Sequence, residues 1–153
     1  MARMLLLVIL MLSGLNVQAH LIIKDAWVRE APPRSRTLAM FLQVTNHGDQ
    51  PEVINGASSE QFSKVELHET SFDKGMMRMK HIPELTMKPD QVLDFKPGGM
   101  HIMLMNPVKI FKAGDQVDIK LHMKNGKKKA VRALVLSSPP VSAGSATQEH
   151  HQH

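Results

Sequence analysis

The chain has 153 residues, a formal net charge of +5 at pH 7 and no cysteine. This length suits one domain with a modest core, and without cysteine neither a disulfide framework nor a thiolate metal site can form. Its one Trp and five Phe residues are not interleaved with basic residues on one face, which argues against a nucleic-acid-binding module.

The N-terminal segment has the pattern of an export signal. A basic start at Arg3 precedes an unbroken apolar run from Met4 to Leu12, and Val17-Gln18-Ala19 resembles a signal-peptidase site. The run is much shorter than the about 20 residues that a membrane span requires, although a retained anchor is an alternative. We therefore expect residues 1–19 to be a cleaved signal peptide, with no membrane span afterwards. Since no cysteine follows the run, we expect no lipid-modified N-terminus.

The rest of the chain has the pattern of an all-β domain over residues 20–138. Short apolar or alternating segments are broken by Gly, Pro, Asn and Asp, and Asn125-Gly126 favours a two-residue hairpin. Nine short strands within about 120 residues suggest a two-sheet β-sandwich. The predicted strands are residues 21–29, 38–45, 53–57, 63–69, 76–81, 91–95, 101–105, 116–123 and 129–137.

After Ser138 the composition changes. Pro139-Pro140 is followed by small and polar residues and then by a terminus with three histidines. This composition predicts that residues 139–153 form a flexible tail.

Two histidines and two methionines are the most informative residues of the chain. His101 and Met103 lie two residues apart on one predicted strand and so share a face, while apolar neighbours face the core. His68 alternates in the same way with apolar neighbours on a second strand, and on a third strand Met79 lies on the face opposite Arg78 and Lys80. Each residue alone is more often structural, but imidazole and thioether together form a ligand set for copper, above all Cu(I). Unlike a thiolate site, such a site cannot form a disulfide in an oxidising compartment. The sequence therefore predicts a copper-handling protein.

The spacing of these residues also resembles that of a known family. His68, ten residues, Met79, twenty-one residues and then His101-Ile102-Met103 is similar to the ligand motif of the periplasmic copper chaperones of the PCuAC type. The resemblance extends over residues 22–137, and the segments that carry it are 25–29, 65–69, 75–79 and 97–105.

The resemblance implies a cupredoxin-like, Greek-key β-sandwich that is not an enzyme and binds one Cu(I) through His68, Met79, His101 and Met103. It implies a periplasmic location and delivery of copper by ligand exchange to the copper centres of cytochrome c oxidase. The acceptor would be an oxidase subunit or another copper chaperone, and we expect a monomer. Thr70 and Met100 depart from the family pattern, but neither departure removes a ligand.

Secondary sites and other functions stay open. Cleavage after residue 19 would give His20 a free amine beside its imidazole, and these two groups together form a good Cu(II) chelate. The alternative is that the cleavage site falls before a histidine by chance. Some family members carry a Cu(II)-binding tail, and His150, His151 and His153 resemble that feature, although a plain polar terminus explains them equally well. The alternatives to a chaperone are an oxidative copper enzyme built on His20 and a metal-free structural or adhesive sandwich. The histidines without a pairing pattern are His47, His81 and His122.

Overall fold

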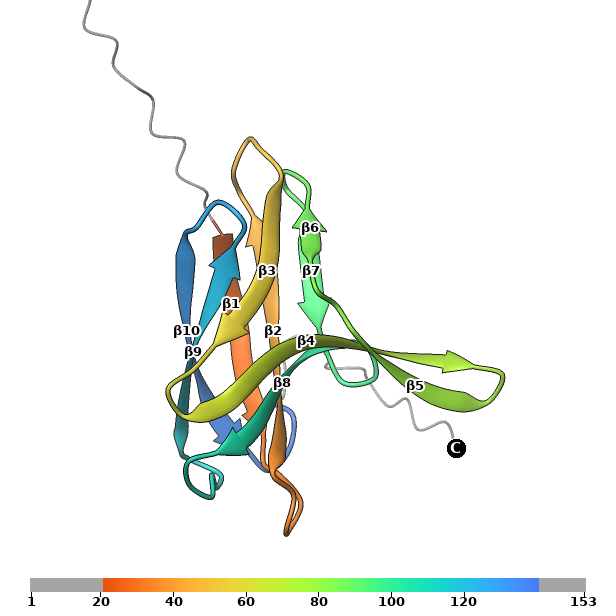
Figure 1. Ribbon diagram of the computed structural model, residues 1–153, viewed down its shortest axis with the longest axis vertical. Coiled ribbons are helices and arrows are strands. Elements are labelled where there is room, and N and C mark those ends of the chain that lie inside the picture. The colour runs from red at the N-terminus through yellow and green to blue at the C-terminus, as the bar shows by residue number, and fades with distance from the viewer. Residues whose placement is uncertain (1–20, 141–153) are drawn as a thin grey trace, which may run out of the picture.

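The computed structural model describes residues 21–140 (Figure 1), which consist of strands and turns without a helix. These residues therefore include no helix with the length and apolar composition needed to cross a membrane. The predicted signal peptide, His20 and the three tail histidines lie outside the described residues. The strands are β1 Leu21–Arg29, β2 Thr37–Asn46, β3 Glu52–Ser58, β4 Phe62–Asp73, β5 Met76–His81, β6 Leu85–Met87, β7 Val92–Phe95, β8 Met100–Pro107, β9 Gln116–Met123 and β10 Lys128–Leu136.

The ten strands form one hydrogen-bonded sheet in the order β5-β4-β8-β7-β2-β1-β10-β9-β3-β6, and β8 also pairs with β2. Most neighbours are antiparallel, but β1 pairs with β10 and β7 with β8 in parallel. The sheet folds over on itself, because β3 and β4 lie against each other although they stand near opposite ends of that order. Two layers therefore enclose one core.

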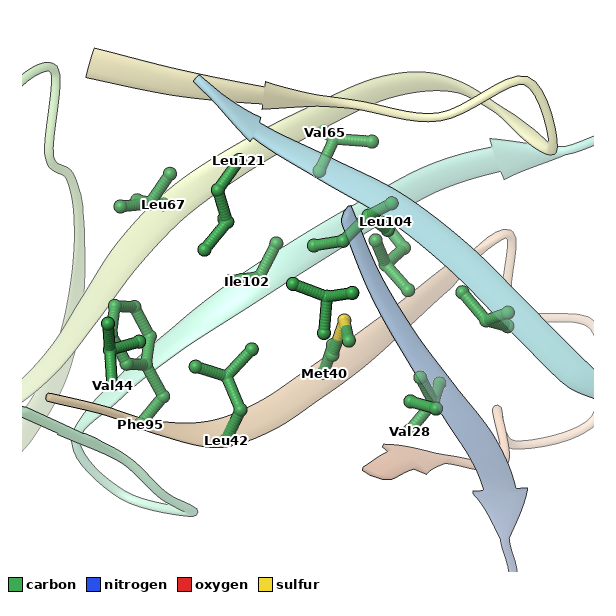
Figure 2. Close-up of a cluster of buried hydrophobic side chains, with 14 of the residues drawn as sticks. Val28, Met40, Leu42, Val44, Val65, Leu67, Phe95, Ile102, Leu104 and Leu121 are labelled. Atoms are coloured by element: carbon green, nitrogen blue, oxygen red, sulfur yellow. The ribbon is translucent and has the colours of Figure 1, made fainter. Parts of the chain in front are cut away.

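The core fills the space between these two layers. Leu67 of β4, together with Ile102 and Leu104 of β8, is almost completely buried, and Leu121 of β9 faces them from the other layer. Figure 2 shows these side chains converging with those of β2, among them Met40. Because side chains alternate along a strand, the residues next to these apolar positions on β4 and β8 must point out of the core.

The all-β prediction is confirmed. All nine predicted strands are present, and three of them, β1, β5 and β9, have the predicted bounds. The additional strand, β6, has only three residues and ends next to Lys88-Pro89, so its sequence carries little strand signal. The two expected layers belong to one sheet because the parallel pairing of Trp27 with Leu134 joins them.

The hairpin of β4 and β5 extends away from the body of the sheet, as Figure 1 shows. Asp73 and Met76 are register partners, and Lys74 and Gly75 between them have φ values of 49° and 79°. Positive φ at both central residues is the condition for a type I′ turn, the tight turn that matches strand twist. This turn fixes which β5 residues face which β4 residues.

A pair of leucine truncations tests the core. Leu104 is 0% exposed and Leu134 is 52% exposed, although both are strand residues. We expect Leu104→Ala to lower the free energy of unfolding by about 2–5 kcal/mol, because it leaves a cavity. Leu134→Ala should cost about 1 kcal/mol or less. Urea denaturation measures both, and equal losses would contradict the core described above.

Candidate metal centre

His68 and His101 face each other across β4 and β8. They are register partners, and their ring centroids lie 6.0 Å apart. Both rings point away from the core, because the next residues, Leu67 and Ile102, fill it. Since a bond from a metal to an imidazole nitrogen is about 2 Å long, two rings at this separation can share one ion after a small adjustment.

The two methionines lie on the same outer face as these histidines. Met103 follows His101 by two residues, so alternation along β8 places both on one face. On β5, Met79 is the register partner of Thr70, which lies two residues beyond His68 on β4. Diagonal neighbours of this kind lie about 7–8 Å apart, within reach of a long side chain. The register therefore puts two imidazoles and two thioethers on one face of three adjacent strands.

Exposure increases from His101 of β8 through His68 of β4 to Met79 of β5, and Met103 is partly buried. His101 is 6% exposed, the side chain of His68 is 13% exposed, and Met79 is 52% exposed. A ligand therefore reaches this face most easily from the β5 side.

The ring of His101 is oriented by the turn before β8. Its Nδ1 lies 3.1 Å from the carbonyl oxygen of Gly99, which also accepts a hydrogen bond from the backbone N–H of Thr70 at 3.1 Å. A carbonyl only accepts, so His101 Nδ1 carries the proton, and the lone pair of the neutral ring lies on Nε2. A backbone carbonyl that holds a histidine in this way is a common outer partner of a metal ligand.

The ring of His68 is held in the opposite tautomer. Its Nε2 lies 3.1 Å from Oε2 of Glu66, and Oε1 of Glu66 accepts from Nζ of Lys64 at 2.7 Å. These contacts, first with Lys64 and then with His68, keep the pKa of Glu66 below its usual value. The ionised carboxylate accepts the proton of His68 Nε2, which leaves the lone pair of the neutral ring on Nδ1.

His68 Nδ1 is the one buried side-chain nitrogen or oxygen of residues 21–140 that has no hydrogen-bond partner. Leaving a buried polar atom unpaired costs about 1–3 kcal/mol, so native structures rarely contain such atoms. A bound metal ion would satisfy this nitrogen, because it accepts the lone pair. This atom fits the metal-binding role that the sequence predicts for His68.

An aromatic cluster lies on the same face, on the far side of β8. Ala39 of β2 is the register partner of Met103, and alternation places Phe41 on the same face as Ala39. The rings of Phe41 and Trp27 lie 4.8 Å apart, both are buried outside the main core, and the Arg29 guanidinium lies 5.6 Å from the Phe41 centroid. The cluster gives this side of the four-residue group an apolar wall.

The structure adds His81 to this face, a residue for which the sequence shows no pairing pattern. His81 is the register partner of His68, and their ring centroids lie 5.6 Å apart. The sequence pattern that could have identified His81 is Met79-x-His81, which is the reverse of His101-x-Met103 on another strand.

Nitrogen and oxygen donors alone do not complete a metal site here. Within residues 21–140, no three side chains of His, Cys, Asp or Glu gather closely enough to hold an ion. A metal site on this face would therefore draw on the thioethers, which favour soft metals such as copper.

The fold is that of solved PCuAC domains. A copper-bound PCuAC domain from PmoF2 matches with a TM-score of 0.64 at 19% identity, over 77% of this chain and 93% of that chain. The Cu(I)-bound solution structure of DR1885 from Deinococcus radiodurans matches with a TM-score of 0.62 at 31% identity, over 80% of this chain and 82% of that chain. These matches define the class, an all-β domain with the PCuAC fold.

The sequence model of the LpqE-like family, described as proposed lipoproteins, matches residues 21–135. The chain belongs to this family, which is the PCuAC family. Lxx21020 of Leifsonia xyli subsp. xyli, whose name proposes a lipoprotein, is 31% identical over 105 residues, 68% of this chain and 62% of that protein. RP573 of Rickettsia prowazekii is 28% identical over 103 residues, 67% of this chain and 57% of that protein. The chain thus spans less than two thirds of the length of these relatives.

The two ring tautomers can be tested in the metal-free protein. We expect the neutral ring of His101 to carry its proton on Nδ1 and the neutral ring of His68 on Nε2, because Gly99 and Glu66 present only acceptors. Long-range proton–nitrogen NMR correlations of the imidazoles distinguish the two forms. Glu66→Ala should mix the tautomers of His68 and leave those of His101 unchanged. If Glu66→Ala also changed the tautomer of His101, the two rings would not be held independently, which would contradict the contacts described above.

Proposed function

We propose that this protein is a copper chaperone that binds one Cu(I) through His68, Met79, His101 and Met103 and passes it on by ligand exchange. The observation that carries the proposal is the buried, unpartnered Nδ1 of His68, directly across the strand pair from His101. The Cu(I)-bound relative DR1885 supports the choice of metal. His68 would bind through Nδ1 and His101 through Nε2.

The donor set favours Cu(I) over Cu(II). Imidazole and thioether are both neutral, so they leave the charge of the bound ion uncancelled, and burial makes a doubly charged ion more costly than a singly charged one. Thioethers also prefer soft ions. No group in this mechanism breaks or forms a covalent bond in a substrate, so we propose a carrier and not an enzyme.

The exposure of the face supports release of copper to another protein. The exposed Met79 can leave the ion first, so that an incoming donor replaces it before the buried His101 lets go. Four neutral ligands hold the ion firmly enough to limit free copper, yet an acceptor with better ligands can remove it. This order of exchange keeps the ion coordinated throughout the transfer.

The acceptor and the location rest on the family. We propose that the protein works in the periplasm and supplies the copper centres of cytochrome c oxidase, directly or through another copper chaperone. The export pattern of residues 1–19 and the lipoprotein names of the family and of Lxx21020 support export. We further propose that residues 20–138 are the copper-binding domain, and that His20 and the histidines of the tail at residues 139–153 take up Cu(II).

Two methionines of β5 offer a matched test of the ligand set. Met79→Leu conserves volume but removes the thioether, so Cu(I) affinity should fall by at least about tenfold, which equals about 1.4 kcal/mol. Met77→Leu should leave the affinity unchanged, because Met77 is opposite Phe72 near the hairpin tip. Competition with a chromophoric Cu(I) chelator measures the affinity of each variant.

X-ray absorption completes that experiment. The loaded protein, with the tail from residue 139 removed, should show two sulfur and two nitrogen neighbours. His101→Ala should abolish tight binding. Full affinity in His101→Ala or Met79→Leu would reject the assignment, and a protein that takes up no stoichiometric copper would be a metal-free domain.

A further inference from the structure

We propose that His81 is a transfer ligand, which binds copper together with His68 while the ion enters or leaves the four-residue site. The inference rests on the proposed function and adds a fifth donor with a separate role. His81 lies on the edge strand β5, and its partner His68 lies in the middle of the donor group.

The backbone pairing brings His81 close to His68. The N–H of Ile82 donates to the carbonyl oxygen of Leu67 at 2.8 Å, so these two residues form a hydrogen-bonded pair. Antiparallel pairs alternate, and the next pair, His68 with His81, is therefore of the non-hydrogen-bonded kind, in which the side chains lie closer together. Their ring centroids are 5.6 Å apart, against 6.0 Å between His68 and His101.

His68 is thus shared by two similar donor groups. On the inner strand β8 it faces His101, with Met103 two residues away, and on the outer strand β5 it faces His81, with Met79 two residues away. Exposure rises from the buried His101 to the exposed His81. A copper ion that moves outward can exchange His101 for His81 while His68 holds it.

The geometry favours successive binding over a fixed site with three imidazoles. Within the described residues, three such donors do not converge on one point, because His101 and His81 flank His68 on opposite sides. The ring of His81 makes no hydrogen bond or ion pair with any side chain of residues 21–140. Its nitrogens can therefore bind an ion without breaking a hydrogen bond or ion pair to a side chain of those residues.

The test compares affinity with transfer rate. His81→Ala should keep the equilibrium Cu(I) affinity within about threefold but slow the transfer of Cu(I) from the loaded protein to bathocuproine disulfonate by about tenfold. Stopped-flow absorbance follows the transfer. Lys80→Ala is the matched control: Lys80 is the neighbouring exposed residue of β5 and points to the other face, so its loss should change neither quantity.

Three other outcomes would contradict either the transfer role of His81 or the proposed function. If His81→Ala binds and releases copper like the wild type, His81 takes no part. If the affinity of His81→Ala falls as far as that of Met79→Leu, His81 is a resident ligand and not a transfer ligand. If the wild-type protein binds no Cu(I), the proposed function itself fails, whereas the first outcome leaves it intact and the second keeps the copper-carrier role but adds His81 to the ligand set.

Discussion

The packing of β4 and β8 against the core is the constraint on which the candidate site depends. Leu67 and Ile102 are register partners whose side chains are buried, and their neighbours His68 and His101 consequently meet on the other face. A shift of one residue in the register would expose the leucine and bury the imidazoles. The apolar core thus sets the positions of the candidate ligands His68 and His101, which need no contact with each other to stay paired.

The orientation of the two imidazole rings is fixed by polar contacts outside the core. Gly99 holds His101, and the chain of Lys64, Glu66 and His68 holds the second ring. The result is a nitrogen lone pair kept buried without a partner, a cost that folding alone gives no reason to retain. The rest of the core must offset this cost, and a bound soft cation would remove it.

Alternation predicted which residues of one strand share a face, and the family resemblance grouped four residues from three strands, but neither identified the contacts that depend on the register between strands. Alternation along β8 was enough to place His101 and Met103 on a common face. The roles of Glu66 and His81 follow from the register between strands, which spacing along the chain does not contain. The same applies to the parallel pairing of Trp27 with Leu134, since residues more than a hundred positions apart along the chain share no local pattern.

The position of β5 at one end of the sheet fits the proposed carrier function, in which copper would enter and leave the site at its exposed side. An edge strand has an unpaired side and invites association with other chains, and charged residues such as Arg78 and Lys80 counter that tendency. The opposite face of the same strand carries the exposed donors Met79 and His81. In the proposed function, an acceptor would reach the thioether and the imidazole of β5 directly, while His101 of β8 stays buried. In that scheme, the buried end of the site would retain the ion and the exposed end would exchange it.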